Sequence, residues 1–213
     1  MLAASIQRLF RADTFAAEIA AFREADRIAP PPEGAILFCG SSSIRMWADL
    51  AEDMAPFRVI NRGFGGSSIP DVVRHFSTIA ALPNPRAIVF YAGDNDLELH
   101  RSAARIVRSF ERFMQLKTAR FGAVPVFFVS IKPAPARTQF RAVREEVNST
   151  MRLRAMQQAD LIYVDIAGPM LGTGRLDDLF LEDRLHLSRA GYEVWRTAIF
   201  NALQALPPVQ SGA

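Results

Sequence analysis

The chain has 213 residues, half of them hydrophobic, and its 25 basic residues outnumber 22 acidic ones for a formal net charge of +3. This length and composition predict one globular domain over residues 1–213 rather than two domains or a disordered chain. The basic residues are scattered singly, without stacking aromatic neighbours, which excludes nucleic acid as an expected partner.

The expected location is the cytoplasm. Charges at Arg8, Arg11 and Asp13 interrupt the N-terminus before it reaches signal-peptide length, and no later apolar run is long enough to span a bilayer. The single cysteine, Cys39, stands in an apolar run without a partner for an internal disulfide, which agrees with a reducing compartment. We therefore expect a soluble protein without membrane insertion.

Strands and helices alternate along the chain. Apolar runs predict strands at 35–39, 57–60, 87–91, 124–131 and 161–166. Apolar residues at helical spacing predict helices at 13–28, 70–79, 103–120, 140–151 and 188–206. This alternation is typical of an α/β domain with a parallel sheet covered by helices on both faces.

Residues that start or stop helices stand at the expected ends. Asp13 is a cap candidate for the first helix, either Ser67 or Ser68 for the second, and Ser188 for the last. Gly122 suits the end of the helix at 103–120.

The densest basic group falls on one predicted helix and consists of Arg141, Arg144, Arg152 and Arg154. Because Glu145 and Glu146 interleave with these arginines, we expect a solvated helix face there rather than a binding patch.

Residues 167–182 form the longest segment without a clear period, and a loop of this length is usually functional or mobile. Its apolar residues are Met170, Leu171, Leu176, Leu179 and Phe180. They suit either a small acyl pocket or packing of the loop onto the domain, and packing is the favoured interpretation.

Polar residues follow the first three predicted strands directly. These are Gly40-Ser41-Ser42-Ser43, a glycine-rich segment at 61–68, and Gly93-Asp94-Asn95-Asp96. Because the carboxyl ends of parallel strands meet at one edge of a sheet, we expect the three segments to lie together.

Taken alone, each candidate residue has a simpler role. The serines, Asn95 and Asp96 suit helix caps, Gly66 suits a turn, and His186 suits a surface position. Together with Asp183, three residues before His186, they supply what acyl transfer needs: a hydroxyl nucleophile, a base, a carboxylate that orients the base, and oxyanion donors. The combination favours a hydrolase with a serine nucleophile.

The segments resemble the blocks of the SGNH hydrolases, also called GDSL esterases and lipases. The matching residues are Gly40-Ser41-Ser42, Gly66, Gly93-Asp94-Asn95-Asp96 and Asp183-Arg184-Leu185-His186. The resemblance covers residues 35–190 and implies a flavodoxin-like three-layer α/β/α sandwich with a five-stranded parallel sheet in the order 2-1-3-4-5. Residues 1–32, an N-terminal helix and a proline-rich connector, lie outside the blocks.

The resemblance also implies the catalytic roles. Ser42 attacks the ester carbonyl, His186 accepts the proton of Ser42, and Asp183 orients His186. The backbone N–H groups of Ser42 and Gly66 and the side-chain amide of Asn95 form the oxyanion hole.

Ser41 departs from the family pattern, which more often has aspartate at this position. Ser41 and Ser43 therefore stay open as nucleophiles, although the position of Gly40 favours Ser42. His75 and His100 match no block and are interpreted as structural.

The predicted function is hydrolysis of small-molecule carboxylic esters with short acyl or acetyl groups, through an acyl-enzyme, with no cofactor and no metal. The alternatives are a carbohydrate deacetylase, a thioesterase or lysophospholipase with the same catalytic residues, and a non-catalytic flavodoxin-like binding module. Lys132 and Arg137, at the ends of a proline-stiffened loop, are candidate substrate-binding residues for a polar or anionic leaving group, although solvated surface charge is the simpler interpretation.

Overall fold

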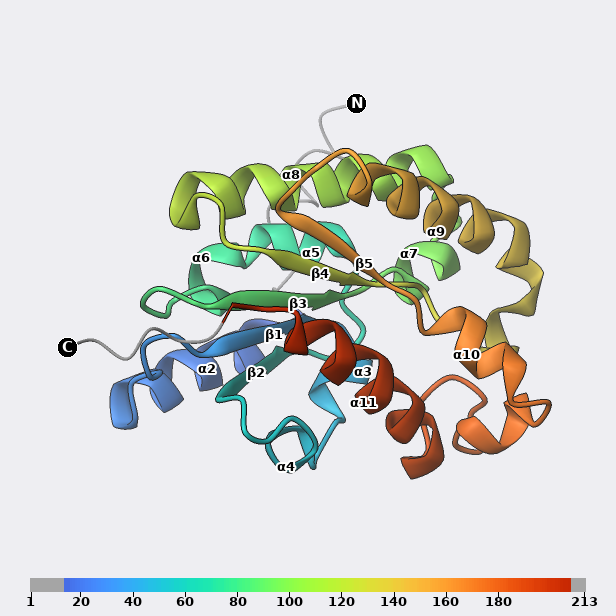
Figure 1. The fold of residues 1–213 in the computed structure, drawn as a ribbon, viewed down its shortest axis with the longest axis horizontal. Helices are drawn as coiled ribbons and strands as arrows, with labels where there is room; N and C mark the ends of the chain where they lie inside the picture. The colour runs from blue at the N-terminus through green and yellow to red at the C-terminus, as the bar shows by residue number, and fades with distance from the viewer. Residues whose placement is uncertain (1–13, 208–213) are drawn as a thin grey trace, which may run out of the picture.

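The computed structural model describes residues 14–207 (Figure 1). The proposed cap Asp13 and the charged residues used to exclude a signal peptide lie outside the described part. Within residues 14–207, no helix has the length and apolar character needed to cross a membrane.

The strands form one parallel sheet in the order β2-β1-β3-β4-β5, which confirms the predicted fold. The strands are β1 (Ile36–Gly40), β2 (Val59–Gly63), β3 (Ala87–Tyr91), β4 (Val126–Val129) and β5 (Leu161–Val164). β2 begins two residues later than predicted and continues through the polar residues 61–63, because they extend the ladder opposite Phe38, Cys39 and Gly40 of β1.

The helices are α2 (Ala16–Ile28), α3 (Ser42–Arg45), α4 (Leu50–Asp53), α5 (Ile69–Arg74), α6 (Phe76–Ile79), α7 (Asp94–Glu98), α8 (Ala103–Phe121), α9 (Arg141–Ala155), α10 (Ala167–Gly172) and α11 (Arg189–Gln204). Two 3-10 helices, η1 (Pro135–Phe140) and η2 (Leu176–Leu179), complete the described elements.

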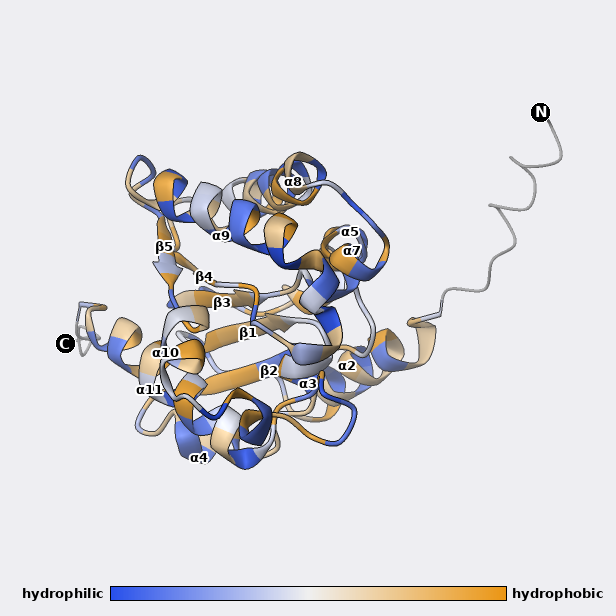
Figure 2. Ribbon diagram, turned by 90° about the vertical axis from the view of Figure 1, so that its right-hand side faces the viewer, coloured by the Kyte–Doolittle hydropathy of each residue, from blue (hydrophilic) through white to orange (hydrophobic). Residues whose placement is uncertain are grey.

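Two hydrophobic clusters pack on opposite faces of the sheet. Leu37, Ile88 and Phe128 face the cluster with α5, α8 and α9, whereas Phe38 and Val89 face the cluster with α10 and α11. α8 and α11 lie on opposite sides of the strands (Figure 1), and the apolar strands run between the helical layers (Figure 2). Because both faces are covered, β1, β3, β4 and β5 are continuous apolar runs rather than alternating ones.

The helix ends follow the expected chemistry. Ser68, rather than Ser67, is the N-cap of α5, where it forms a capping box with Asp71. The side chain of Ser188 accepts a hydrogen bond from the N–H of Gly191 at the start of α11, and Gly122 ends α8 with a φ of 60°. The single helix predicted at 70–79 is divided at His75 into α5 and α6.

Two further expectations need correction. Residues 167–182 are not an open loop but form α10 and η2, which are too short to show a period; Met170, Leu179 and Phe180 are buried there. Arg144 is buried instead of solvated, because it lies one turn from the buried Asn148, on the face of α9 that packs against the domain.

Candidate active site

Four segments that are distant in sequence meet beyond the carboxyl ends of β1, β2 and β3. Ser42 begins α3 just after β1, Gly66 follows β2, and Asn95 lies in the first turn of α7 after β3. His186 comes from the segment between η2 and α11 and reaches Ser42 across the sheet edge. The structure therefore brings the four predicted segments into one place.

A chain of hydrogen bonds joins three of the predicted residues. Nε2 of His186 lies 2.9 Å from Oγ of Ser42, and Nδ1 of His186 lies 2.5 Å from Oδ2 of Asp183. Oδ1 of Asp183 accepts hydrogen bonds of 2.9 Å from the backbone N–H groups of Leu185 and His186, which orient the carboxylate. Because the carboxylate accepts from Nδ1–H, Nε2 is left to accept the proton of the serine hydroxyl.

Asp183 is held in its charged form. Its partial burial acts to raise the pKa, but the hydrogen bonds from the His186 side chain and from the backbone N–H groups of His186 and Leu185 outweigh this effect. The resulting pKa is about 2, so the carboxylate stays ionised at neutral pH.

The three consecutive serines differ in their surroundings. Ser41 and Ser43 are each 1% exposed, whereas Ser42 is half-buried and lines the cavity beside His186. The N–H of Ser41 donates to the carbonyl of Tyr91, and Oγ of Ser43 accepts from Nζ of Lys132. Of the three hydroxyls, the one on Ser42 is the one placed for attack on a ligand.

Two glycines set the geometry of the turns after β1 and β3. Gly40 and Gly93 both have φ of 139°, a conformation that residues with a side chain rarely adopt. A Cβ on Gly40 would come within 1.7 Å of the carbonyl oxygen of Tyr91, and one on Gly93 within 2.4 Å of the Ile131 side chain. These contacts explain why glycine precedes the serine and the asparagine by two residues in both motifs.

The other two predicted oxyanion donors border the same cavity. The side-chain amide of Asn95 donates to the carbonyl oxygen of Ser67 at 2.9 Å, which fixes the amide next to the loop that carries Gly66. Asp96 does not cap its own helix, because its Oδ2 accepts from the N–H of Ile69 at the start of α5. That contact ties the Asn95 turn to the glycine-rich loop.

The cavity around Ser42 has a volume of about 580 Å³. Its lining residues are Thr14, Glu18, Ser42, Arg45, Gly65, Gly66, Asn95, Leu185 and His186. Glu18 belongs to α2, outside the family blocks; it accepts a hydrogen bond of 3.0 Å from the N–H of Gly65 and lies 3.6 Å from Arg45. No motif signals this contribution, although Glu18 lies next to Ile19, the buried residue of α2.

The two predicted substrate-binding residues lie elsewhere. Lys132 is 1% exposed and pairs with Asp94, and Arg137 pairs with Glu98 at 3.0 Å. Neither side chain borders the cavity around Ser42.

The remaining histidines, His75 and His100, lie against Phe64 and Phe140, respectively, and neither lines this cavity.

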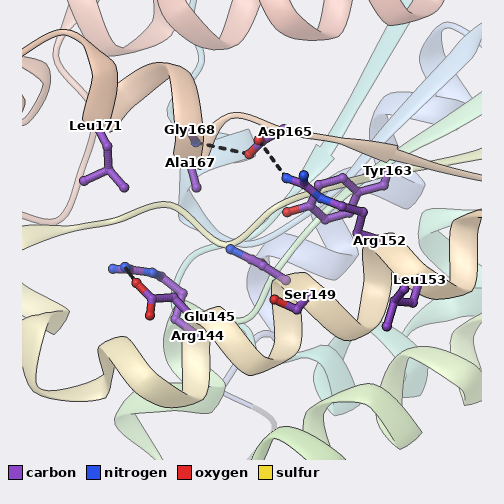
Figure 3. A pocket seen from close by; sticks show the side chains of 11 residues that line it. Arg144, Glu145, Ser149, Arg152, Leu153, Tyr163, Asp165, Ala167, Gly168 and Leu171 are labelled. Carbon is purple, nitrogen blue, oxygen red and sulfur yellow. Dashed lines mark hydrogen bonds and ion pairs between the residues drawn. The ribbon is translucent and has the colours of Figure 1, made fainter.

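A second cavity of about 480 Å³ lies between α9, the end of β5 and α10 (Figure 3). In this cavity the guanidinium of Arg152 donates a hydrogen bond of 2.9 Å to the carboxylate of Asp165 and lies over the ring of Tyr163. Arg144 lies beside Glu145. Ser149 lines this cavity, but no histidine does. Without a histidine beside its serine, this cavity lacks the arrangement found around Ser42.

A parallel α/β fold that places a serine, a histidine and an aspartate in hydrogen-bonding order at its strand ends is typical of hydrolases with a serine nucleophile. The profile of the GDSL-like Lipase/Acylhydrolase family matches residues 30–194, which is most of the chain. The chain belongs to this family.

Solved structures support the same fold. A Streptococcus pneumonia protein, provisionally described as a platelet activating factor, has a TM-score of 0.77 and 19% identity, over 95% of this chain and 98% of its own. A GDSL-like lipase from Bacteroides thetaiotaomicron has a TM-score of 0.69 and 19% identity, over 88% and 98%. A carbohydrate esterase family 3 protein from Talaromyces cellulolyticus has a TM-score of 0.65 and 20% identity, over 81% and 97%. Among curated proteins, none matches the sequence significantly.

Proposed function

We propose that the protein hydrolyses carboxylic esters through an acyl-enzyme formed on Ser42. The observation that carries this proposal is the continuous chain of hydrogen bonds from Asp183 through His186 to Oγ of Ser42. In the first step Oγ of Ser42 attacks the ester carbonyl carbon while Nε2 of His186 takes the hydroxyl proton. His186 then gives that proton to the departing alcohol, and the carboxylate of Asp183 stabilises the transient imidazolium.

Water completes the reaction. It attacks the acyl group on Ser42, loses a proton to His186, and the acid leaves as the proton returns to Oγ of Ser42. In both steps the negative charge on the carbonyl oxygen needs fixed donors. The backbone N–H groups of Ser42 and Gly66 and the second N–H of the Asn95 amide, beyond the one given to Ser67, are the proposed donors.

The cavity lining favours a short acyl group and a polar leaving group. Among residues 14–207, the only lining residue with an aliphatic side chain is Leu185, whereas Glu18 and Arg45 place charges at the wall of the cavity. A long acyl chain needs an extended apolar groove, which this lining does not provide. The polar wall makes a carbohydrate deacetylase the better supported alternative, ahead of a lysophospholipase or a long-chain thioesterase.

Labelling with a fluorophosphonate tests the nucleophile. The expected result is hydrolysis of p-nitrophenyl acetate by the natural chain, a covalent label on Ser42 located by mass spectrometry, and loss of both in Ser42→Ala. The matched variants Ser41→Ala and Ser43→Ala should keep measurable hydrolysis. A label on Ser41 or Ser43 would overturn the assignment, and absence of both label and hydrolysis would favour a non-catalytic binding module.

A series of p-nitrophenyl esters tests the acyl preference. We expect kcat/KM to be highest between acetyl and butyryl esters and to fall for longer chains. A steady rise through decanoate would contradict the short-chain proposal and favour a lipase or long-chain thioesterase.

A further inference from the structure

A buried polar cluster lies directly behind the turn that carries Ser42, and the proposed reaction does not use it. We call it the Lys132 cluster; its members are Ser43, Tyr91, Asp94 and Lys132, all 3% exposed or less. Nζ of Lys132 donates to Oγ of Ser43 at 3.0 Å and to the hydroxyl of Tyr91 at 3.1 Å, and forms an ion pair with Asp94. The hydroxyl of Tyr91 also donates to the Asp94 carboxylate.

Stability alone is a poor reason for such a cluster. Taking a lysine and an aspartate out of water costs several kcal/mol per ion. A protein with well-packed apolar residues of similar volume in their place is often equally stable. Here Oδ1 of Asp94 has no hydrogen-bond partner among the described residues, so the pair is not even fully satisfied. Burial lowers the pKa of Lys132, and the nearby carboxylate of Asp94 offsets only part of that shift.

Two members of the cluster are immediate neighbours of proposed catalytic groups. Ser43 follows Ser42 in α3, and Asp94 precedes Asn95 in α7. The carbonyl oxygen of Ser43 accepts from the hydroxyl of Tyr192 at 2.9 Å, which ties α3 also to α11, the helix that follows His186. Lys132, just after β4, therefore bonds both the turn of the nucleophile and the turn of the amide donor.

We propose that Lys132 is a positioning residue, which with Asp94 and Ser43 fixes the distance between Oγ of Ser42 and the side-chain amide of Asn95. This inference rests on the proposed ester hydrolysis. The attacking oxygen and the oxyanion donors act on neighbouring atoms of one carbonyl group, and a misplacement of about 1 Å can cost ~10²-fold in rate. The proposal differs from substrate binding, because the ammonium of Lys132 is buried and does not line the cavity around Ser42.

The decisive variant is the double substitution Asp94→Asn/Lys132→Met. Lys132→Met alone leaves a buried carboxylate unpaired and destabilises the fold, whereas the double substitution removes both charges and largely keeps the volume. We expect a melting temperature near that of the natural chain, a fall in kcat of about 10- to 100-fold, and a KM within about twofold.

The chain offers a matched control in its other lysine. Lys117 is also fully buried and pairs with Asp160, and it also bonds the carbonyl of Gly122. That pair lies between the end of α8 and the start of β5, at the opposite end of the sheet strands from Ser42. Asp160→Asn/Lys117→Met is expected to leave kcat and KM unchanged, whatever it does to stability.

Ser43→Ala keeps the ion pair intact and provides the second measurement if the double variant does not fold. It should lower kcat severalfold at unchanged KM and melting temperature. If the folded double variant has the same kcat as the natural chain, the positioning role is overturned. If the double variant does not fold, an unchanged kcat in Ser43→Ala overturns it instead. A raised KM at unchanged kcat would show instead that Lys132 binds substrate. A natural chain that hydrolyses no ester would contradict the proposed function itself, so the two failures are distinct.

Discussion

Two acid–base pairs lie on opposite sides of the turn that carries Ser42. The side chains of Asp183 and His186 are 47% and 22% exposed, whereas those of Asp94 and Lys132 are 4% and 1% exposed. Both pairs join a carboxylate to a basic side chain that also contacts a serine of the same turn. Lys132 uses Nζ for both contacts, whereas His186 bonds Asp183 through Nδ1 and Ser42 through Nε2. Their access to solvent is the main difference between them.

The difference in solvent exposure suits the two pairs to different roles. A pair that moves a proton to and from a substrate must reach the cavity, and its base must change charge without a large desolvation cost. A pair that holds backbone in place benefits from a dry interior, where electrostatic interactions are strong and its partners are fixed. We therefore expect damage to the exposed pair to affect rate, and removal of only one partner of the buried pair to affect both rate and fold.

The largest expected effect comes from the exposed pair. His186→Ala removes the proposed base, and loss of the corresponding group in other serine hydrolases costs about 10⁴-fold or more in kcat. The partly exposed position of His186 predicts a melting temperature close to that of the natural chain. Steady-state kinetics and a thermal melt check this prediction. Substantial hydrolysis by the folded variant would remove His186 from the reaction.

A smaller effect is expected from the amide donor that the buried pair is proposed to position. Asn95→Ala should lower kcat by about 10²–10³-fold, since that is the typical loss for one oxyanion donor. Its bond to the carbonyl of Ser67 is worth only about 1 kcal/mol, so the variant should fold. The control Asn148→Ala removes a buried amide that bonds the backbone of Ile131 instead, and it should lower stability more than kcat. An unchanged kcat in Asn95→Ala would exclude it as a donor.

The smallest effect concerns acid stability. The folded-state pKa of Asp183, about 2, is lower than the ordinary value of 3.8, so the folded state binds fewer protons there than the unfolded state. The stability contributed by this carboxylate is fully present above pH of about 4 and is lost as the pH falls through about 2. Asp183→Asn should therefore lose less stability than the natural chain between pH 4 and 2 in chemical unfolding experiments. Equal pH dependence in the two proteins would contradict the low pKa.

Much of the fold could be predicted from local patterns. The apolar runs around β1, β3, β4 and β5 are long enough to distinguish strands from the amphipathic helices between them. β2 is harder to place from its pattern, since Asn61 and Arg62 are polar and belong to the strand only because β1 lies beside them. The sheet order came from the family resemblance rather than from periodicity.

The residues that meet at the candidate site could be named from the sequence: the motifs at strand ends need only the parallel sheet to bring Ser42 and Asn95 together, and the family resemblance adds His186. The surroundings of these residues depend on the tertiary structure. It placed Glu18 of α2 in the cavity wall, buried Arg144, and turned Lys132 from an expected surface charge into a buried partner of Asp94. The physical reason is that a charge can be buried only where partners from distant segments offset its desolvation, and no local pattern contains those partners.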